Sequence, residues 1–242
     1  MMNVREAREL GERIAILVTD RRFEEAGDLL YPVLLERTPF RLLDEVGGRV
    51  GAEPLDAVNV FLDRVAAQRT MGGWVVIASA LRQQLNRDLP GAFGRCRSYV
   101  IVADVWYGTD IFGERVPGPA LVRDFEPSLA ALTPWRGDAN RWVRRMVGVA
   151  VHYWAKHARG AAASRPEASA LLDFLEPLFT ERDSDAIKGV GWGLKTLGKY
   201  YPELVADWLG RQAGRPYRAL MLRKATAYLP LDLRLSLNKK MP

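Results

Sequence analysis

Residues 184–200 read SDAIKGVGWGLKTLGKY, and this stretch has the pattern of a helix. Its apolar side chains Ile187, Val190, Leu194 and Leu197 recur at spacings of three and four, the period of an amphipathic helix. Asp183 precedes the run, where a carboxylate can accept hydrogen bonds from the open amides of a helix start. The sequence therefore predicts a helix over 184–200 with an N-terminal cap.

The same helical period fills most of the chain. Glycines and prolines separate the periodic runs and are expected to lie between helices. Residues 99–105 are locally β-like, but a single such run makes no sheet, so they are interpreted as a buried helix or its end. Residues 108–125, rich in Gly and Pro, are expected to be the longest irregular segment, a loop or hairpin. The other predicted helices cover 4–18, 24–35, 55–68, 74–86, 140–157, 168–180 and 202–212, with breaks at Gly47-Gly48, Pro54, Pro90-Gly91, Pro117-Gly118-Pro119, Pro134, Pro202 and Pro216.

These helices form units of similar length. Residues 142–155 overlay on 187–200 at an offset of 45, and each is followed by a second helix. A repeat near 40 residues built from two helices is typical of a HEAT-type unit. Such units bury one face against their neighbours and leave a continuous concave surface. The prediction is an all-α solenoid of HEAT-like repeats, a single domain over residues 1–242.

Composition excludes several classes of protein. The hydrophobic fraction of 48% indicates a folded chain. Residues 1–13 contain no apolar h-region, and no run approaches the ~18 apolar residues that span a bilayer, so a cytoplasmic protein is expected. A lone Cys96 and two histidines leave little for a disulfide or a metal site, so neither metal nor cofactor is expected.

Positive charge is concentrated away from the N-terminus. Residues 1–60 carry 12 acidic and 8 basic side chains, whereas the whole chain has a formal net charge of +6. Residues 136–159 hold six Lys/Arg against Asp138 alone, and eight Lys/Arg follow from Arg211 onward against Asp232. Clustered basic charge is the electrostatic footprint of a polyanion-binding surface. An Arg-rich surface that only solubilises the protein is the alternative.

Three tryptophan-centred motifs point to one family. Trp106 is followed four residues later by Asp110, Trp142 three residues later by Arg145, and Lys188 by Trp192-Gly-Leu. In order and spacing these motifs resemble the AlkD-type DNA alkylation-repair glycosylases, which are built from HEAT-like repeats and remove alkylated purines. The motifs cover roughly residues 100–235, and the helical layout is similar over the whole chain.

The resemblance implies a mechanism and a set of site residues. An alkylated purine is cationic and leaves readily, so the enzyme has to stabilise positive charge developing on the deoxyribose. Asp110 matches the family's carboxylate for this role, and Trp106 and Trp192 its tryptophans on the sugar–phosphate backbone. Arg145 would hold a phosphate, with Arg144, Lys188 and Arg141 as further DNA-binding residues. The product would be an abasic site in an intact strand of duplex DNA, made by a monomer without metal or cofactor.

Other readings of these residues stay open. Trp142 is expected in the core, and Trp106 and Trp192 could lie there too. Asp110 could cap a helix, with Asp104 and Asp124 as competing carboxylates. Arg144 and Arg145 cannot both point the same way on a helix, so one is expected to be solvated or ion-paired. His152 and His157 receive no catalytic role.

Two further questions concern function. Gly189, Gly191 and Gly193 surround Trp192, and glycine costs ~1 kcal/mol relative to alanine inside a helix. They therefore indicate close approach by a neighbouring helix or by the ligand, and the second case would suit DNA adducts bulkier than methyl. A non-catalytic HEAT-like protein that binds damaged or branched DNA, or a protein scaffold, is the alternative to the enzyme.

Overall fold

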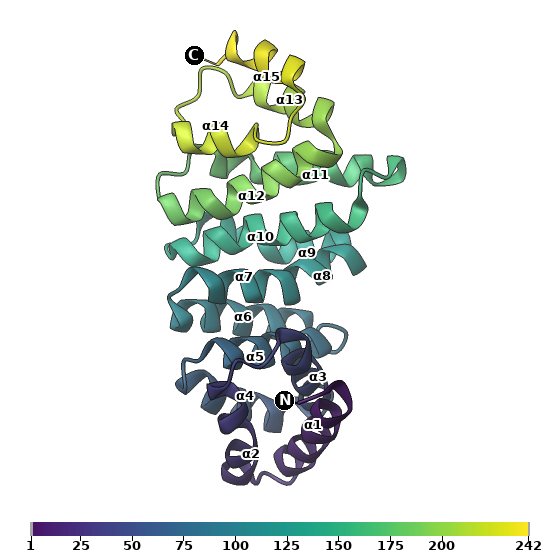
Figure 1. Cartoon of the computed structure of the whole chain (residues 1–242). Helices are drawn as coiled ribbons and strands as arrows, with labels where there is room; N and C mark the ends of the chain where they lie inside the picture. Colours follow the sequence, from purple (N-terminus) through teal and green to yellow (C-terminus); the bar gives the residue numbers. More distant parts are fainter. Residues whose placement is uncertain (1, 242) are drawn as a thin grey trace. The chain divides into compact units, whose positions relative to one another are not determined.

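In the computed structural model of the chain, which describes residues 2–241, regular structure is helical throughout and no strand occurs among these residues (Figure 1). The prediction of an all-α fold is confirmed. The chain divides into two compact units, Met1–Val116 and Pro117–Pro242. A single domain over residues 1–242 and a concave groove stay predictions. None of the helices in residues 2–241 combines the length and apolar character that a bilayer crossing requires.

The first unit contains seven helices within its described residues. They are α1 (Val4–Thr19), α2 (Phe23–Leu35), α3 (Phe40–Gly51), α4 (Leu55–Ala67), α5 (Met71–Gln84), α6 (Leu89–Ala103) and α7 (Trp106–Arg115). The second unit consists of α8 (Pro117–Arg123), α9 (Phe125–Leu132), η1 (Thr133–Gly137), α10 (Arg141–Ala158), η2 (Ala162–Ser164), α11 (Arg165–Leu175), η3 (Glu176–Thr180), α12 (Ser184–Tyr200), α13 (Pro202–Arg211), α14 (Ala219–Ala225) and α15 (Leu231–Asn238).

Alternate helices pack side by side in the first unit, α1 on α3, α3 on α5 and α5 on α7. The prediction of a break at Gly47-Gly48 is wrong, because both residues lie inside α3. A β-carbon at Gly47 would collide with the Val76 carbonyl of α5, and one at Gly51 with the Ala80 carbonyl. These glycines therefore allow two helix backbones to approach closely rather than ending a helix.

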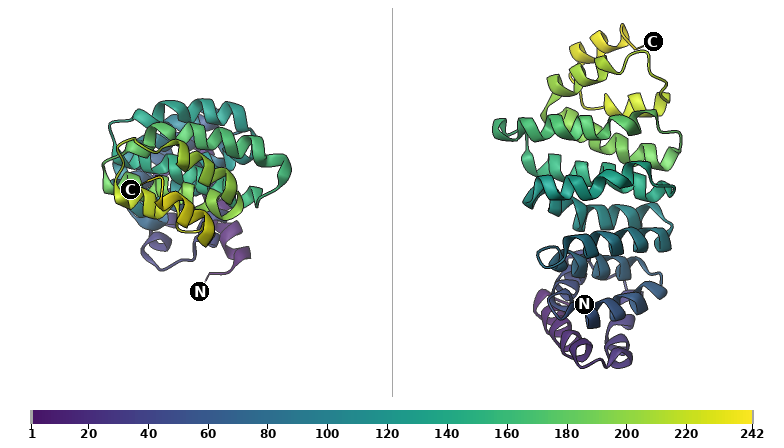
Figure 2. Two further views of the ribbon diagram at one scale, coloured as in Figure 1. Left: turned by 90° about the horizontal axis from the view of Figure 1, so that it is seen from above. Right: turned by 180° about the vertical axis from the view of Figure 1, so that it is seen from behind.

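The second unit repeats this arrangement. α8, α10, α12 and α14 contact one another in sequence, and α10, α12 and α14 lie side by side in Figure 1 and in the reverse view of Figure 2. α12 has the predicted bounds, and the Asp183 side chain accepts hydrogen bonds from the amides of Asp185 and Ala186, as predicted. The expected helix end at 99–105 is also confirmed, since α6 ends at Ala103, but only Tyr99 and Val100 of this stretch are buried.

Residues 108–125 form helices, so the prediction of a long irregular loop is wrong. Most of the segment belongs to α7 and α8. Pro117 and Pro119 lie in the first turn of α8, where no amide donor is required by the helix. Pro90 is likewise at the start of α6, and Pro134 at the start of η1. Pro90, Pro117 and Pro134 therefore begin elements rather than separate them, whereas Pro32 lies inside α2.

Candidate functional site

Trp106 and Asp110 lie one helical turn apart on α7, so they share a face of that helix. Trp106 is the first residue of the helix, and its side chain is 56% exposed. Asp110 is partly exposed and lies inside the helix, which excludes the capping role. Asp104 instead ends α6 in the left-handed conformation, at φ 46°, and Asp124 accepts a hydrogen bond of 2.6 Å from Arg123 Nε.

Basic side chains gather where α10 and α12 begin. Lys188 Nζ lies 2.9 Å from Asp185 Oδ1, and Arg145 Nη1 donates to the Asp185 carbonyl at 3.1 Å. The hydrogen bond from Lys188, opposed by partial burial, lowers the pKa of Asp185, and the charges of Lys188, Arg145 and Arg141 lower it further. Three cations thus surround one carboxylate at two helix N-termini, an arrangement that favours an additional anion.

Arg144 has a structural role within the second unit. Its Nε donates to Glu181 Oε2 at 2.5 Å, and its Nη1 donates to the carbonyls of Asp138 and Ala139 at 2.7 and 3.0 Å. Burial raises the pKa of Glu181, but hydrogen bonds from Arg144 and from the amides of Asp183 and Arg182 lower it overall. The expectation that one of the two arginines is ion-paired is confirmed. Phosphate binding by Arg144 stays a prediction.

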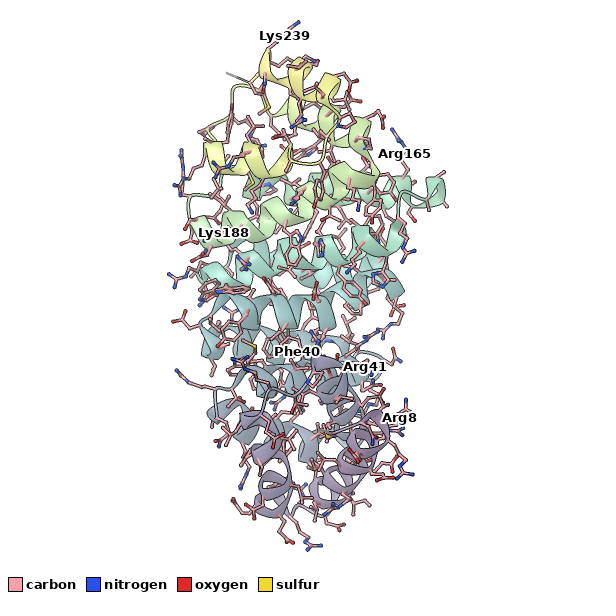
Figure 3. The ribbon with its side chains drawn as sticks, viewed as in Figure 1. Arg8, Phe40, Arg41, Arg165, Lys188 and Lys239 are labelled. Carbon is pink, nitrogen blue, oxygen red and sulfur yellow. The ribbon has the colours of Figure 1, made fainter. Side chains whose placement is uncertain are left out.

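Arg145 is almost entirely covered. Only 6% of the residue is exposed, and its γ carbon lies against α12 at the point where Gly189 lacks a side chain. Arg141 and Lys188 are the exposed members of the predicted phosphate-binding set, and Lys188 projects near the start of α12 (Figure 3). The Arg141 guanidinium lies 4.8 Å from the ring centre of Trp142. Trp142 itself is 5% exposed, which confirms its predicted place in the core.

One face of α12 combines cations with aromatic rings. Lys188, Trp192, Lys195 and Lys199 follow at steps of four, three and four residues, so they form a stripe along the helix. Each is at least partly exposed. Lys195 Nζ lies 4.1 Å from the ring centre of the exposed Tyr228, and Lys199 Nζ lies 6.0 Å from it. Lys195 directly follows the Trp192-Gly-Leu motif of the sequence. Neither Lys199 nor Tyr228 was predicted, although helical spacing from Lys188 would have found Lys199.

The ring of Trp192 stacks on His152, a residue to which the sequence analysis gave no catalytic role. The ring centre of His152 lies 3.9 Å from that of Trp192, with 24° between the planes. His152 Nδ1 is 2.7 Å from the hydroxyl of Thr196, and this hydroxyl donates to the Trp192 carbonyl at 2.9 Å. His152 is buried, whereas Trp192 is partly exposed. α10 therefore supports the tryptophan of α12 from the protein side.

The glycines around Trp192 are accounted for by neighbouring helices. A β-carbon at Gly189 would collide with the Arg145 carbonyl, and one at Gly193 would lie 2.7 Å from the Gly148 carbonyl. At Gly191 the contact is with Lys224 Cβ of α14, at 2.5 Å. Of the two causes left open, helix packing is the one observed. The glycines therefore give no reason to expect bulky adducts, and adduct size stays a prediction.

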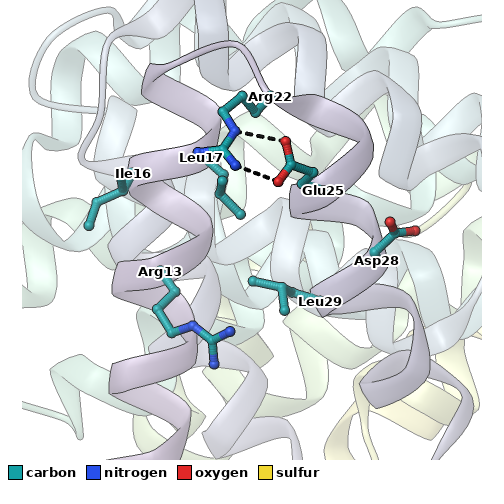
Figure 4. Close-up of a pocket in the computed structure, with 7 residues that line it drawn as sticks. All are labelled: Arg13, Ile16, Leu17, Arg22, Glu25, Asp28 and Leu29. Atoms are coloured by element: carbon teal, nitrogen blue, oxygen red, sulfur yellow. Dashed lines mark hydrogen bonds and ion pairs between the residues drawn. The ribbon is translucent and has the colours of Figure 1, made fainter.

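Two surface hollows lie within the first unit. One, with a volume of about 470 Å³, lies between α1 and α2 and contains the ion pair of Arg22 with Glu25 (Figure 4). The second, of about 490 Å³, is lined by charged residues of α3 together with Ala52 and Gln83. Neither is lined by a predicted site residue. Within residues 2–241, no group of three or more His, Cys, Asp and Glu side chains is placed to hold a metal ion.

Fold and surface together define an all-helical repeat protein with a basic, aromatic helix face. The model of the DNA alkylation repair enzyme family matches residues 61–229, and the chain belongs to this family. The match includes Trp106, Asp110, Arg145 and Trp192.

A solved structure has a similar fold. It is the Pseudomonas fluorescens alkylpurine DNA glycosylase AlkC bound to DNA containing an abasic site analog, with a TM-score of 0.58 and 20% sequence identity. The match covers 91% of this chain and 62% of that one, so this chain spans less than two thirds of the glycosylase. The likeness confirms the helical repeat fold. No curated protein shows significant sequence similarity to the chain.

Proposed function

We propose that this protein is a monofunctional DNA glycosylase that hydrolyses the N-glycosidic bond of cationic N3- or N7-alkylated purines in duplex DNA. The observation that supports it most is the pair on α7, an exposed Trp106 with Asp110 one turn later on the same face. Membership of the DNA alkylation repair family supports the same reaction class.

The chemistry assigned to these residues balances without a cofactor. As the bond from C1′ to the purine nitrogen lengthens, its electron pair leaves with the base, which becomes neutral, and positive charge develops on the sugar. A carboxylate at Asp110 would stabilise that charge and orient the attacking water, which gives a proton to the carboxylate as its oxygen bonds to C1′. The products are the free alkylated base and an abasic site.

The face of α12 is assigned to the DNA backbone. Trp192 would pack its indole against a sugar, and Lys188, Lys195 and Lys199 would contact phosphates along the strand. Arg141 and Lys188, the exposed cations at the starts of α10 and α12, would set register. Arg145 and Arg144 lie behind them, and Arg144 is held by its ion pair to Glu181. Contacts of this kind read the backbone and need no deep base pocket.

Release of the free base tests the proposal. Duplex DNA carrying N7-methylguanine, N3-methyladenine or a bulky N7-guanine adduct is incubated with the protein, and the released base is measured by mass spectrometry. We expect release of at least one of these bases, with the strand left intact until alkali is added. Salt-sensitive binding to the same duplexes without any release would favour the non-catalytic DNA-binding protein, and no binding would favour a scaffold.

A further inference from the structure

The indole of Trp192 has a built support beneath it. The buried His152 ring stacks on it at 3.9 Å, and the Thr196 hydroxyl bonds to both residues. An indole side chain on a helix surface has two rotatable bonds and several accessible rotamers. Stacking with a ring that is itself held by a hydrogen bond removes most of that freedom. The arrangement is therefore suited to hold the tryptophan in one orientation.

The hydrogen bonds of Thr196 indicate which nitrogen of His152 bears the proton. A threonine hydroxyl has one proton to donate, and the Trp192 carbonyl 2.9 Å away can only accept, so that proton is assigned to the carbonyl. Towards His152 the same oxygen acts as an acceptor. The donor across the 2.7 Å contact is thus Nδ1–H of the imidazole. A neutral ring then carries its lone pair on Nε2.

The surroundings keep the ring neutral. Burial lowers the pKa of His152 to about 4, and the positive charges of Lys156 on its own helix and Lys195 on α12 act in the same direction. At neutral pH, therefore, an uncharged imidazole stacks on the indole, and no buried cation is added beside the two lysines.

We propose that His152 and Thr196 are positioning residues that hold the Trp192 indole in place through a stack and a hydrogen-bonded chain, with His152 as the neutral Nδ1–H tautomer. The consequence for base excision rests on the function proposed above for Trp192. The orientation of the Trp192 ring and the tautomer of His152 are independent of the proposed function, because both are properties of the free protein.

The first experiment concerns the free protein. Fluorotryptophan-labelled protein is examined by fluorine NMR, with the Trp192 signal identified by its loss in Trp192→Phe. We expect Thr196→Val to shift or broaden the Trp192 signal, and Thr196→Ser, which keeps the hydroxyl, to leave it near its original position. Nitrogen NMR of the imidazole should show Nδ1 protonated and Nε2 unprotonated at pH 7. An unchanged Trp192 signal in Thr196→Val, or the opposite tautomer, would overturn the proposal.

The second experiment measures single-turnover excision separately from DNA affinity. A misplaced contact group can cost up to ~100-fold in rate, so we expect His152→Gln and Thr196→Val to slow excision by roughly tenfold. DNA affinity should change less than about twofold, because the phosphate contacts remain. Thr196→Ser should restore most of the rate. If His152 and Thr196 only stabilised the fold, the variants would lower thermal stability without this selective loss of excision rate and its rescue by Thr196→Ser.

A double-mutant cycle shows whether His152 acts through Trp192. In a Trp192→Ala background the effect of His152→Gln on excision should disappear, because the positioned ring is gone. An effect of equal size in both backgrounds would overturn the positioning role. If the wild type released no base, the proposed function would fail, and the two NMR measurements would still decide the positioning and the tautomer.

Discussion

The imidazole of His152 stacks against the indole of Trp192 with ring centres 3.9 Å apart, and the histidine is the buried partner. Its pKa of about 4 lies below the ordinary value near 6.5, so between these values the unfolded chain binds more protons than the folded one. Stability should therefore fall as pH falls from 6.5 to 4, by roughly 2–3 kcal/mol from this residue.

Chemical denaturation of the wild type and His152→Gln across pH 4–7 checks this prediction. The glutamine variant removes the titrating ring, so its stability should depend less steeply on pH between 6.5 and 4. Parallel curves for the two proteins would show that His152 does not titrate in this way.

Gly189→Ala is expected to destabilise the second unit. Its β-carbon would collide with the Arg145 carbonyl, and overpacking of this kind typically costs about 1–3 kcal/mol. Gly94→Ala in α6 is the matched control, because no atom lies within 4 Å of its β-carbon. That variant should be stabilised by up to ~1 kcal/mol, since alanine favours a helix interior. Thermal unfolding should show a loss of stability for Gly189→Ala and a gain for Gly94→Ala. The same change in stability in both variants would contradict the packing argument.

Arg144→Gln should lower stability more than it lowers DNA affinity. The change leaves the Glu181 carboxylate without its ion pair and two carbonyls without a donor, a loss of about 1–3 kcal/mol. Denaturation and DNA binding are measured on the same preparation. A large loss of affinity in a protein of normal stability would instead assign Arg144 to the phosphate contacts.

Lys188→Gln should weaken DNA binding and make it less dependent on salt. One lost phosphate contact reduces the slope of log affinity against log salt by about 0.9. Lys239→Gln is the control, since that exposed lysine lies at the end of α15, away from Lys188 within the second unit (Figure 3). Binding isotherms at several salt concentrations give both slopes, and equal slopes for the two variants would remove the face of α12 from the interface.

Local sequence patterns predicted those features that depend on local chemistry. Periodicity and capping within α12 predict its bounds and its Asp183 cap. The pattern of α10 likewise predicts the buried Trp142. The break predicted at Gly47-Gly48 is wrong because spacing alone cannot distinguish a helix break from a close crossing with α5. The prediction that Pro117 lies between helices is likewise wrong, because α8 starts there.

Features that depend on tertiary partners could not be found in this way. The ion pair between Arg144 and Glu181 joins residues 37 positions apart. His152 meets Thr196 across 44 positions. A histidine in an apolar helix pattern is usually an ordinary buried residue, and only its stacking on Trp192 from another helix gives it a role.

The role proposed for the Asp110 carboxylate in glycosidic bond hydrolysis is tested by Asp110→Asn in single-turnover release of N7-methylguanine from duplex DNA. Loss of one charge-stabilising group typically lowers a rate by about 10²–10³-fold, and we expect a loss of that size with DNA affinity nearly unchanged. Asp104→Asn is the control, because asparagine suits the left-handed position that ends α6. Release by the wild type and Asp104→Asn but not by Asp110→Asn would support the account. Equal release by all three proteins would contradict it.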